Sequence, residues 1–232
     1  MIEPVKLIWA TPDIDKHLGY IARVSNPANQ ANEKVEGLFA YMMREGHTSP
    51  FEMANVCLEI NTTRDIGRQI IRHRSFSFQE FSQRYQDVST LELPPYREAR
   101  LQDPENRQNS LQTDDNELIE WFEDSQALAT DVCYDLYNQA LAKGIAKEQA
   151  RALLPEGLTP SRMYMNGNLR SWIFYLKARL DPTTQKEHRI IAQDVLYVLR
   201  GVAPKTMEAF FPSTVCDWCG LKGFHHPDCK QL

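Results

Sequence analysis

The chain has 232 residues, a formal net charge of −5 at pH 7 and a pI near 5.7. This length is enough to bury a sizeable core in one domain or in two small ones. The acidic balance argues against general binding to nucleic acid or to an acidic membrane, and no apolar run approaches the roughly 20 residues that span a bilayer. No signal-peptide pattern opens the chain, so we expect a cytoplasmic protein.

The first fifty residues predict a short strand and two helices. The strand covers residues 6–10. The first helix should begin at Thr11, because threonine is a common helix cap, and should end before Pro27. A second helix is expected from Asn32 to Gly46, because apolar residues recur there at helical spacing and glycine commonly ends a helix.

The middle of the chain predicts a strand, a helix, a long loop and a second helix. Alternating apolar residues indicate a half-buried strand over 52–60, and Thr63 can cap the helix after it. The polar stretch 86–116 lacks periodicity, and a loop of this length in a compact chain is usually functional. Thr113 should begin a long helix that ends at Gly144. We interpret its apolar stripe as core: Leu118, Trp121, Phe122, Leu128, Val132, Leu136, Tyr137, Ala140 and Leu141.

The last third predicts one strand among helices. The strand is expected over 159–165, and the helices over 146–154, after Asn168, after Thr183 or Thr184, and over 204–211. No repeat or change of composition marks a boundary. We therefore expect a single catalytic α+β domain over 1–212, followed by a tail over 213–232.

A basic segment interrupts these elements. Arg72, His73 and Arg74 are consecutive, and Ser82 and Arg84 follow closely. Adjacent cations repel one another, so such a cluster usually binds an anion. The aromatic residues between them favour burial: Phe76, Phe78, Phe81 and Tyr85. The segment therefore predicts a lined pocket for a flat, phosphorylated ligand.

The chain lacks both common backbone motifs for phosphate, G-x-G-x-x-G and G-x-x-x-x-G-K-[ST]. A nucleotide would therefore be held by side chains, chiefly arginines. The arginines elsewhere that are candidates to converge on the basic segment are Arg23, Arg151, Arg162, Arg170 and Arg179.

The sequence also predicts the protonation, pairing or burial of several reactive side chains. The two flanking arginines should disfavour the protonated form of His73. Glu80 is expected to be an ion-pair partner that spaces the cations, or a ligand contact. Cys57 and Cys133 lie in apolar patterns and should be buried, and no base stands beside Ser82. No protein nucleophile is therefore evident.

The tail contains Cys216, Cys219, His225 and Cys229. These thiols and this imidazole are sufficient for a tetrahedral zinc site, but their spacing is short for a zinc finger. We therefore predict no metal and keep zinc as the alternative.

Taken together, these segments resemble the flavin-dependent thymidylate synthases. The R-H-R at 72–74 with S-x-R-Y at 82–85 is similar to the signature of that family. Further matches in the order of the family are Ala22-Arg23-Val24-Ser25, His47-x-Ser49-Pro50-Phe51-Glu52, Asn106-Arg107-Gln108, Arg151-Ala152-Leu153-Leu154-Pro155 and Asn168-Leu169-Arg170-Ser171. The resemblance covers roughly residues 5 to 211.

The resemblance implies a fold, an assembly and a reaction. The fold is α+β, with an antiparallel sheet packed with helices, in a homotetramer whose active sites are shared between subunits. The reaction is the reductive methylation of dUMP to dTMP. The carbon donor is 5,10-methylenetetrahydrofolate, FAD carries the hydride and NADPH is the reductant. A flavin hydride at uracil C6 replaces the cysteine nucleophile of other thymidylate synthases.

The resemblance also implies roles for individual residues. FAD contacts are expected from Ser25, His47, Ser49, Arg72, His73, Arg74, Asn168 and Arg170. Contacts to dUMP are expected from Gln69, Arg72, Glu80, Phe81, Ser82, Gln83, Arg84 and Arg179, with Arg151 supplied by another subunit. Arg179 is the expected catalytic residue, because a permanent cation can stabilise charge that develops on the uracil. Phe174, Thr183 and Met53 depart from the family pattern where flavin or folate contacts are expected.

Two alternatives stay open at this point. A related enzyme of the same fold would make a hydroxymethylated pyrimidine nucleotide. A nucleic-acid-binding module would use the R-H-R with its aromatic neighbours, although the acidic net charge weighs against it.

Overall fold

A four-stranded antiparallel sheet organises the fold. The computed structural model describes residues 3–212. Strands β1 (Val5–Ala10), β2 (Asn55–Thr63), β6 (Pro160–Asn168) and β3 (Ser77–Glu80) lie in the order β1-β2-β6-β3. Every neighbouring pair is antiparallel. The expected α+β fold with an antiparallel sheet is confirmed.

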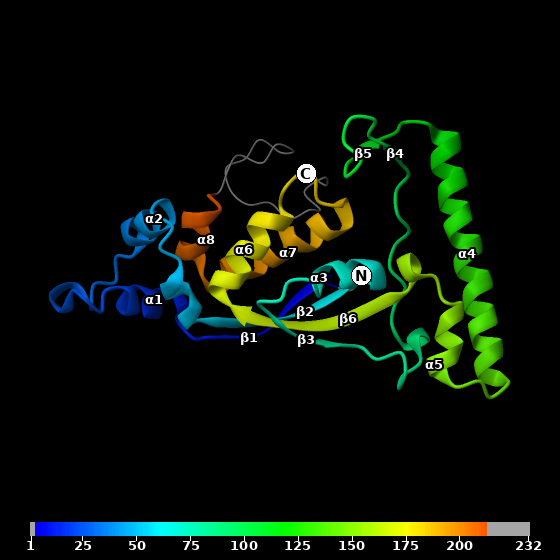
Figure 1. Ribbon diagram of the computed structural model, residues 1–232, viewed down its shortest axis with the longest axis horizontal. Coiled ribbons are helices and arrows are strands. Elements are labelled where there is room, and N and C mark those ends of the chain that lie inside the picture. Colours follow the sequence, from blue (N-terminus) through cyan, green and yellow to red (C-terminus); the bar gives the residue numbers. More distant parts are fainter. Residues whose placement is uncertain (1–2, 213–232) are drawn as a thin grey trace.

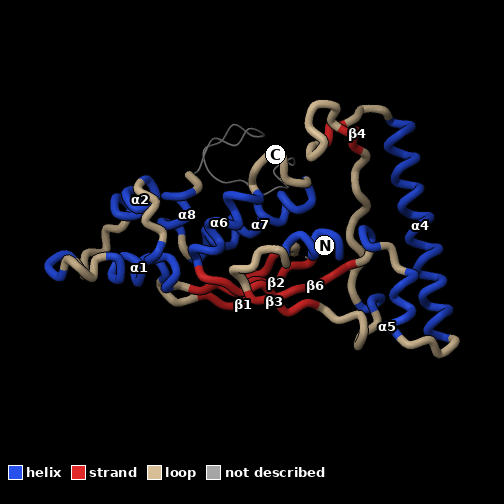
Figure 2. Tube along the Cα trace, in the orientation of Figure 1, coloured by secondary structure: helices blue, strands red, loops and turns tan. Residues whose placement is uncertain are grey.

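Helices cover one face of this sheet, as Figures 1 and 2 show. They are α3 (Arg64–Ile70), α6 (Leu169–Arg179) and α7 (Lys186–Val202). Alternate residues of the central strands, among them Leu58, Ile60 and Met163, are fully buried in the main core. The period of two in a strand sends the residues between them, such as Tyr164, to the other face.

Three helices pack at the end of the sheet where β6 passes into α6. They are α1 (Ile14–Ala22), α2 (Glu36–Arg44) and α8 (Pro204–Phe210). Phe51 joins them, with ring centroids 5.6 Å from Phe39 and 5.1 Å from Phe210 in edge-to-face contacts. Such aromatic contacts add about 0.5–1.5 kcal/mol each beyond burial.

The opposite end holds the long helix α4 (Asn116–Ala142) and the short α5 (Lys147–Ala150), beside a hairpin of β4 (Arg100–Gln102) and β5 (Ser110–Gln112). Tyr137, Val88 and Ala150 form a second, smaller core there. Five short 3-10 helices complete the described chain: Pro27–Asn29, Ser49–Met53, Val88–Thr90, Arg151–Leu153 and Glu156–Leu158.

Arg97 ties the extended connection before α4 to the rest of the molecule. Its Nη2 lies 2.8 Å from both carboxylate oxygens of Asp65, at the start of α3. Gln126 on α4 accepts from the backbone N–H of Arg97 and donates to its carbonyl, both at 2.9 Å. The stretch 86–116 is therefore fastened to the fold, and it contains a 3-10 helix and the strands β4 and β5 where the sequence predicted only a loop.

Two predicted helix starts were too early. Thr11 does not cap α1, because it extends the pairing of β1 with β2 through its contacts to Asn55. The second helix begins at Glu36 rather than at Asn32, because Arg23 binds the backbone carbonyls of Asn32 and Lys34 and holds this stretch extended.

Of the predicted caps of the later helices, one is confirmed and two are wrong. Asn168 caps α6 as predicted, accepting from the backbone N–H of Ser171 at 2.9 Å. The long helix is capped by Asp115, not Thr113. Thr183 closes a turn onto Asp181, so α7 begins only at Lys186. A carboxylate thus replaces the expected threonine cap on α4, whereas α7 begins after Gln185 without a side-chain cap.

The interpretation of the α4 stripe as core was wrong for four of its nine residues. Trp121, Leu128, Val132 and Leu136 are 63%, 66%, 49% and 45% exposed. The helix buries Gln126, Thr130 and Tyr137, of which Tyr137 belongs both to the predicted stripe and to the smaller core. Within the described range, nothing covers the outer stripe. None of the helices that the structure describes is long and apolar enough to cross a membrane.

Candidate active site

Helix α6 lies along the basic segment and contacts it at both ends. In the first turn, Ser171 donates its hydroxyl to the carbonyl of Ser75 at 3.3 Å. In the last turn, Nε of Arg179 donates to Nε2 of His73 at 2.9 Å. The cap at Asn168 fixes where this helix begins, so it also sets the position of Arg179 relative to His73.

The imidazole of His73 is neutral. Burial, reinforced by the charge of Arg179, lowers the pKa of His73 to about 4. Its ring packs edge-on against Tyr175, with centroids 4.9 Å apart. The predicted direction is confirmed, but its cause differs, because burial and Arg179 act rather than the two flanking arginines.

The cations that flank His73 lack a counter-ion in the described part of the chain. Arg72 and Arg74 are exposed, and neither makes an ion pair or side-chain hydrogen bond there. Glu80 does not space them, contrary to one of the two expectations for it. It accepts from Ser161 at 2.7 Å and lies 3.5 Å from Arg64. The cluster therefore has room for an external anion.

Of the aromatic residues of the segment, Phe76 and Phe78 pack against the main core and Phe81 is half-buried, whereas Tyr85, which was expected to be buried, is 75% exposed. The ring of Phe76 lies 4.7 Å from Trp172 in an edge-to-face contact. A Cβ on Gly167 would stand 2.4 Å from Phe76, so glycine is required where this ring crosses β6. Phe78 pairs with Met165 of β6 as part of β3, a strand that the sequence did not predict. These rings hold the turn rather than line a pocket.

A second group of expected cofactor residues gathers at the start of α6. Arg170 donates from Nε to the hydroxyl of Thr48 at 2.9 Å and lies 3.4 Å from Glu52. His47 and Ser49 flank Thr48 and are exposed. This contact joins two motifs that are far apart in sequence. Ser25 lies in the exposed turn after α1, and no contact within the described residues links it to them.

The three departures from the family pattern are all at the surface. Phe174 is 46% exposed, and the Arg170 guanidinium lies 5.0 Å from its ring centroid. Met53 is 61% exposed. The hydroxyl of Thr183 donates to Asp181 at 2.5 Å. Phe174 thus presents an aromatic face beside the second group of cofactor residues.

Two of the expected nucleotide contacts, Gln83 and Arg151, line a pocket of about 450 Å³ on the other side of α3, whereas Ser82 and Arg84 are not among its lining residues. Gln83 is only 5% exposed, and its Nε2 has no hydrogen-bond partner among the described residues. Arg84 and Arg151 both contact Glu148, at 3.4 and 3.2 Å. The pocket is lined by Arg64, Arg68, Gln83, Glu148, Arg151, Ala152, Leu154 and Glu156. A buried donor among arginines suits an anion.

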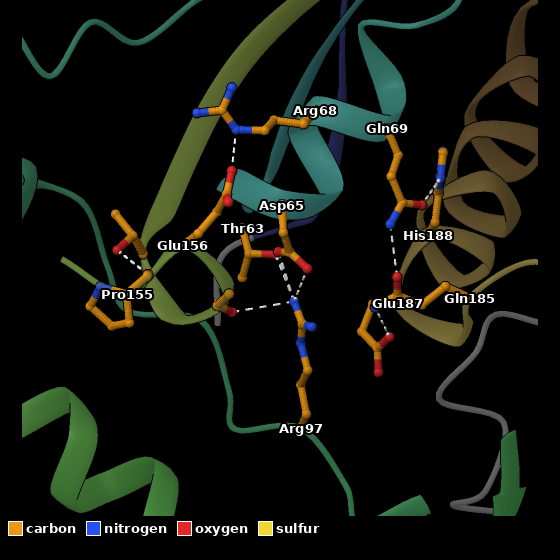
Figure 3. A network of polar contacts seen from close by, with 12 residues as sticks. Thr63, Asp65, Arg68, Gln69, Arg97, Pro155, Glu156, Gln185, Glu187 and His188 are labelled. Atoms are coloured by element: carbon orange, nitrogen blue, oxygen red, sulfur yellow. Dashed lines mark hydrogen bonds and ion pairs between the residues drawn. The ribbon is translucent and has the colours of Figure 1, made fainter. Parts of the chain in front are cut away.

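The structure divides the expected nucleotide residues into two groups. Arg68 points towards Glu156, whereas Gln69 points towards α7 (Figure 3). Nε2 of Gln69 donates to Oε1 of Gln185 at 2.8 Å, and its Oε1 lies 3.1 Å from Nδ1 of His188. Gln69 therefore belongs with the Arg179 group, while Gln83 and Arg151 lie across α3.

Sequence reasoning missed the residues that support Gln69. They are Arg100, Tyr175, Gln185, Glu187 and His188. The available signal was His188, three residues before the buried Ile191 on the same helix face. Two arginine candidates do not reach the site, because Arg23 binds backbone oxygens and Arg162 donates to Asn61 on β2.

Cysteine and metal chemistry find no support in residues 3–212. Cys57 is 8% exposed, and burial raises the pKa of its thiol, which confirms the prediction of an inert residue. Cys133 is half-buried rather than buried. No group of three metal-binding side chains occurs in this range. Cys216, Cys219, His225 and Cys229 lie outside the described residues.

A family model described as thymidylate synthase complementing protein matches residues 6–205. A protein of Synechocystis named flavin-dependent thymidylate synthase is 53% identical over 175 residues, which cover 75% of this chain and 79% of that protein. The chain belongs to the flavin-dependent thymidylate synthase family. The resemblance seen in the sequence is thereby confirmed.

A second relative and a solved structure are also similar to this chain. A protein of Paramecium bursaria Chlorella virus 1, named probable flavin-dependent thymidylate synthase, is 49% identical over 172 residues, or 74% of this chain and 78% of that protein. The crystal structure of a UMP/dUMP methylase, PolB of Streptomyces cacaoi, bound to 5-Br dUMP, superposes with a TM-score of 0.77. It is 29% identical and covers 89% of this chain and 93% of that one.

Proposed function

We propose that the chain catalyses the reductive methylation of dUMP to dTMP. The overall reaction consumes dUMP, methylenetetrahydrofolate, NADPH and a proton, and yields dTMP, tetrahydrofolate and NADP+. The observation that carries this proposal is the pair of arginines, Arg72 and Arg74, that have no counter-ion among residues 3–212 and lie on either side of the neutral His73. Family membership supplies the reaction, and the solved relative that binds 5-Br dUMP supports the choice of nucleotide.

FAD fits the residues at the start of α6 and in the basic segment. Arg72, Arg74 and Arg170 would hold its pyrophosphate, because arginine binds phosphate through paired N–H donors. His47, Ser49 and Asn168 would contact it beside them, and Ser25 would reach it only through its exposed turn. When bound, the flavin supplies a hydride and carries electrons from NADPH to the nucleotide.

Arg179 would act on the uracil ring. Its Nε is occupied by His73, which leaves both terminal nitrogens for a ligand. A guanidinium keeps its charge at every working pH, so it can stabilise negative charge that develops on the ring. His73 would hold this cation in place by accepting its hydrogen bond.

No side chain needs to attack the nucleotide. Cys57 is buried and far from the thiolate state. Within residues 3–212, no histidine or carboxylate hydrogen-bonds the Ser82 hydroxyl to activate it. Ser82, Gln83, Arg84 and Phe81 would instead bind the nucleotide, and Glu80 would order them through Arg64 and Ser161.

The division of the nucleotide residues supports a homotetramer with shared sites. One chain places Gln69 and Arg179 on one side of α3, and Gln83 and Arg151 on the other. A second copy that brings Arg151 to the Gln69 side would complete the site. The exposed stripe of α4 is a surface that such an assembly can cover, because exposed apolar faces commonly mark interfaces.

The other functions receive less support. Relatives named thymidylate synthase, or methylase, favour a methyl product over a hydroxymethyl product. The acidic net charge and the absence of an extended basic surface weigh against a nucleic-acid module. We also keep the cytoplasm as the expected location.

The flavin provides a direct test. Purified protein should be yellow or should bind added FAD, and anaerobic NADPH should bleach it. The colour should return without oxygen only when dUMP and methylenetetrahydrofolate are both added. Protein that stays colourless and binds no FAD would contradict the proposal.

A further inference from the structure

A fully buried histidine joins three helices beside the proposed nucleotide site. His188 on α7 is 0% exposed. Its Nδ1 lies 3.1 Å from Oε1 of Gln69 on α3, and its Nε2 lies 3.2 Å from the hydroxyl of Tyr175 on α6. Figure 3 shows the first of these contacts and its continuation to Gln185 and Glu187.

The hydrogen bonds from Glu187 to Gln69 have one direction. An ionised carboxylate only accepts, so Gln185 must donate to Oε2 of Glu187 through its Nε2, at 2.9 Å. Oε1 of Gln185 therefore faces Gln69, which donates to it through Nε2 at 2.8 Å. The amide of Gln69 is thereby turned with its oxygen towards His188.

This direction sets the tautomer of the histidine. Because Oε1 of Gln69 can only accept, Nδ1 of His188 must carry the proton. Nε2 then holds a lone pair and accepts from Tyr175. Burial, reinforced by the charge of Arg179, lowers the pKa of His188 to about 3. The imidazole therefore remains neutral near pH 7.

An ion pair fixes Glu187, where this series of hydrogen bonds ends. Burial alone would raise the pKa of Glu187, but hydrogen bonds from Arg100, from its own backbone and from Gln185 outweigh it and lower the pKa. Arg100 on β4 contacts this carboxylate directly. The orientation of Gln69 thus depends on a charged pair outside the pocket.

We propose that His188 is a positioning residue of the nucleotide site, which holds the Gln69 amide in a single orientation. The inference rests on the proposed function, since Gln69 is there a contact of dUMP. Of the two N–H groups on Nε2 of Gln69, Gln185 takes one. The second stays available for an acceptor on the nucleotide, a uracil carbonyl or a phosphate oxygen. Without the Nδ1–H donor, only the contact with Gln185 would oppose a flip of the amide, and a flipped amide would present an oxygen to that acceptor.

Two substitutions of His188 distinguish the role of Nδ1 from that of Nε2. In His188→Asn the side-chain N–H stands near the place of Nδ1 and keeps the donor to Gln69. In His188→Gln the amide reaches the place of Nε2 and the Nδ1 donor is lost. We expect the KM for dUMP to rise about tenfold in His188→Gln and to stay near the wild-type value in His188→Asn. The kcat at saturating dUMP should change little in either variant.

A double-mutant cycle distinguishes positioning from packing. In a Gln69→Ala background, His188→Gln should no longer raise the KM for dUMP, because the amide that it orients is absent. A KM that rises equally in both backgrounds, or equally in the Asn and Gln variants, would overturn the inference.

A measurement on the unaltered protein keeps the inference testable if a variant fails to fold. Spectra of histidine labelled with nitrogen-15 should show His188 as the neutral tautomer protonated at Nδ1, and the Nε2–H tautomer would overturn the proposal. Wild-type protein that does not turn over dUMP would instead contradict the proposed function. Normal wild-type turnover with an unchanged KM in His188→Gln would refute the positioning role alone.

Discussion

Arg179 donates its Nε–H to Nε2 of His73 across 2.9 Å. This contact connects the last turn of α6 to the centre of the basic motif. Because His73 must offer a lone pair, its proton resides on Nδ1 and its ring is neutral. The pair therefore carries one positive charge, which is located on Arg179 and faces the site through the terminal nitrogens.

The first prediction concerns the shape of that cation. Arg179→Lys keeps the charge but removes the planar fork and the Nε donor to His73. We expect kcat to fall by about 10²–10³-fold, the usual cost of losing one such stabilising donor, with the fold intact by circular dichroism. The matched control is Arg162→Lys, since Arg162 pairs with Asn61 and Glu59 on the sheet. Wild-type turnover in Arg179→Lys would show that the cation acts elsewhere.

The second prediction concerns stability at low pH. The pKa values of His73 and His188, about 4 and about 3, lie below the ordinary value of 6.5. As the pH falls below 6.5, these two histidines bind protons in the unfolded chain but not in the folded chain. The free energy of unfolding therefore decreases. The loss should continue to about pH 3, where the folded chain takes up the last of these protons.

Thermal unfolding measures this effect. Between about pH 7.5 and pH 5, the wild-type Tm should fall by more than that of His188→Asn, which cannot titrate at this position. The control is Asn138→Gln, because this exposed substitution removes no titratable group and should show the wild-type fall in Tm. An identical fall in Tm for wild type and His188→Asn would contradict the buried neutral histidine.

The third prediction tests whether sites are shared between subunits. Arg179→Lys and Arg151→Ala should each be nearly inactive alone. When equal amounts of both are unfolded and refolded together, about one quarter of all sites should combine two intact residues and recover activity. Mixing Arg179→Lys with Arg179→Ala is the control and should recover nothing. Absence of recovery in the first mixture would place both arginines in one subunit's site.

The fourth prediction concerns the exposed stripe of α4. Leu128→Lys places a charge at a position that is 66% exposed in the isolated chain. If another copy covers the stripe, the variant should dissociate, and light scattering should report a smaller particle. Asn138→Lys on the same helix, outside the stripe, should keep the wild-type mass. An assembly unchanged by Leu128→Lys would exclude this face as an interface.

Most of the fold followed from local patterns. The alternation in β2 and β6 and the cap at Asn168 were sufficient to place the central strands and α6, because burial and capping there involve neighbouring residues. Gly46 and Gly144 ended their helices as expected, with positive φ values of 70° and 83°. These conformations favour glycine.

Long-range contacts account for what the sequence did not reveal. Strand β3 is defined by its pairing with β6. The start of α2 depends on Arg23, which binds carbonyls 9 and 11 residues further along the chain. The role of His188 could not be predicted, because only folding brings it between Gln69 and Tyr175. The outer stripe of α4 looked like core because periodicity reports an apolar face without identifying what covers it.

The central claim is that this site transfers a methyl group to dUMP with flavin as the hydride source. The most direct measurement is anaerobic turnover of dUMP with methylenetetrahydrofolate and NADPH, followed by mass spectrometry of the nucleotide. The account predicts dTMP, heavier than dUMP by one CH₂ unit, and tetrahydrofolate in equal amount. A hydroxymethylated nucleotide, or unchanged dUMP from protein that has bound FAD, would contradict it.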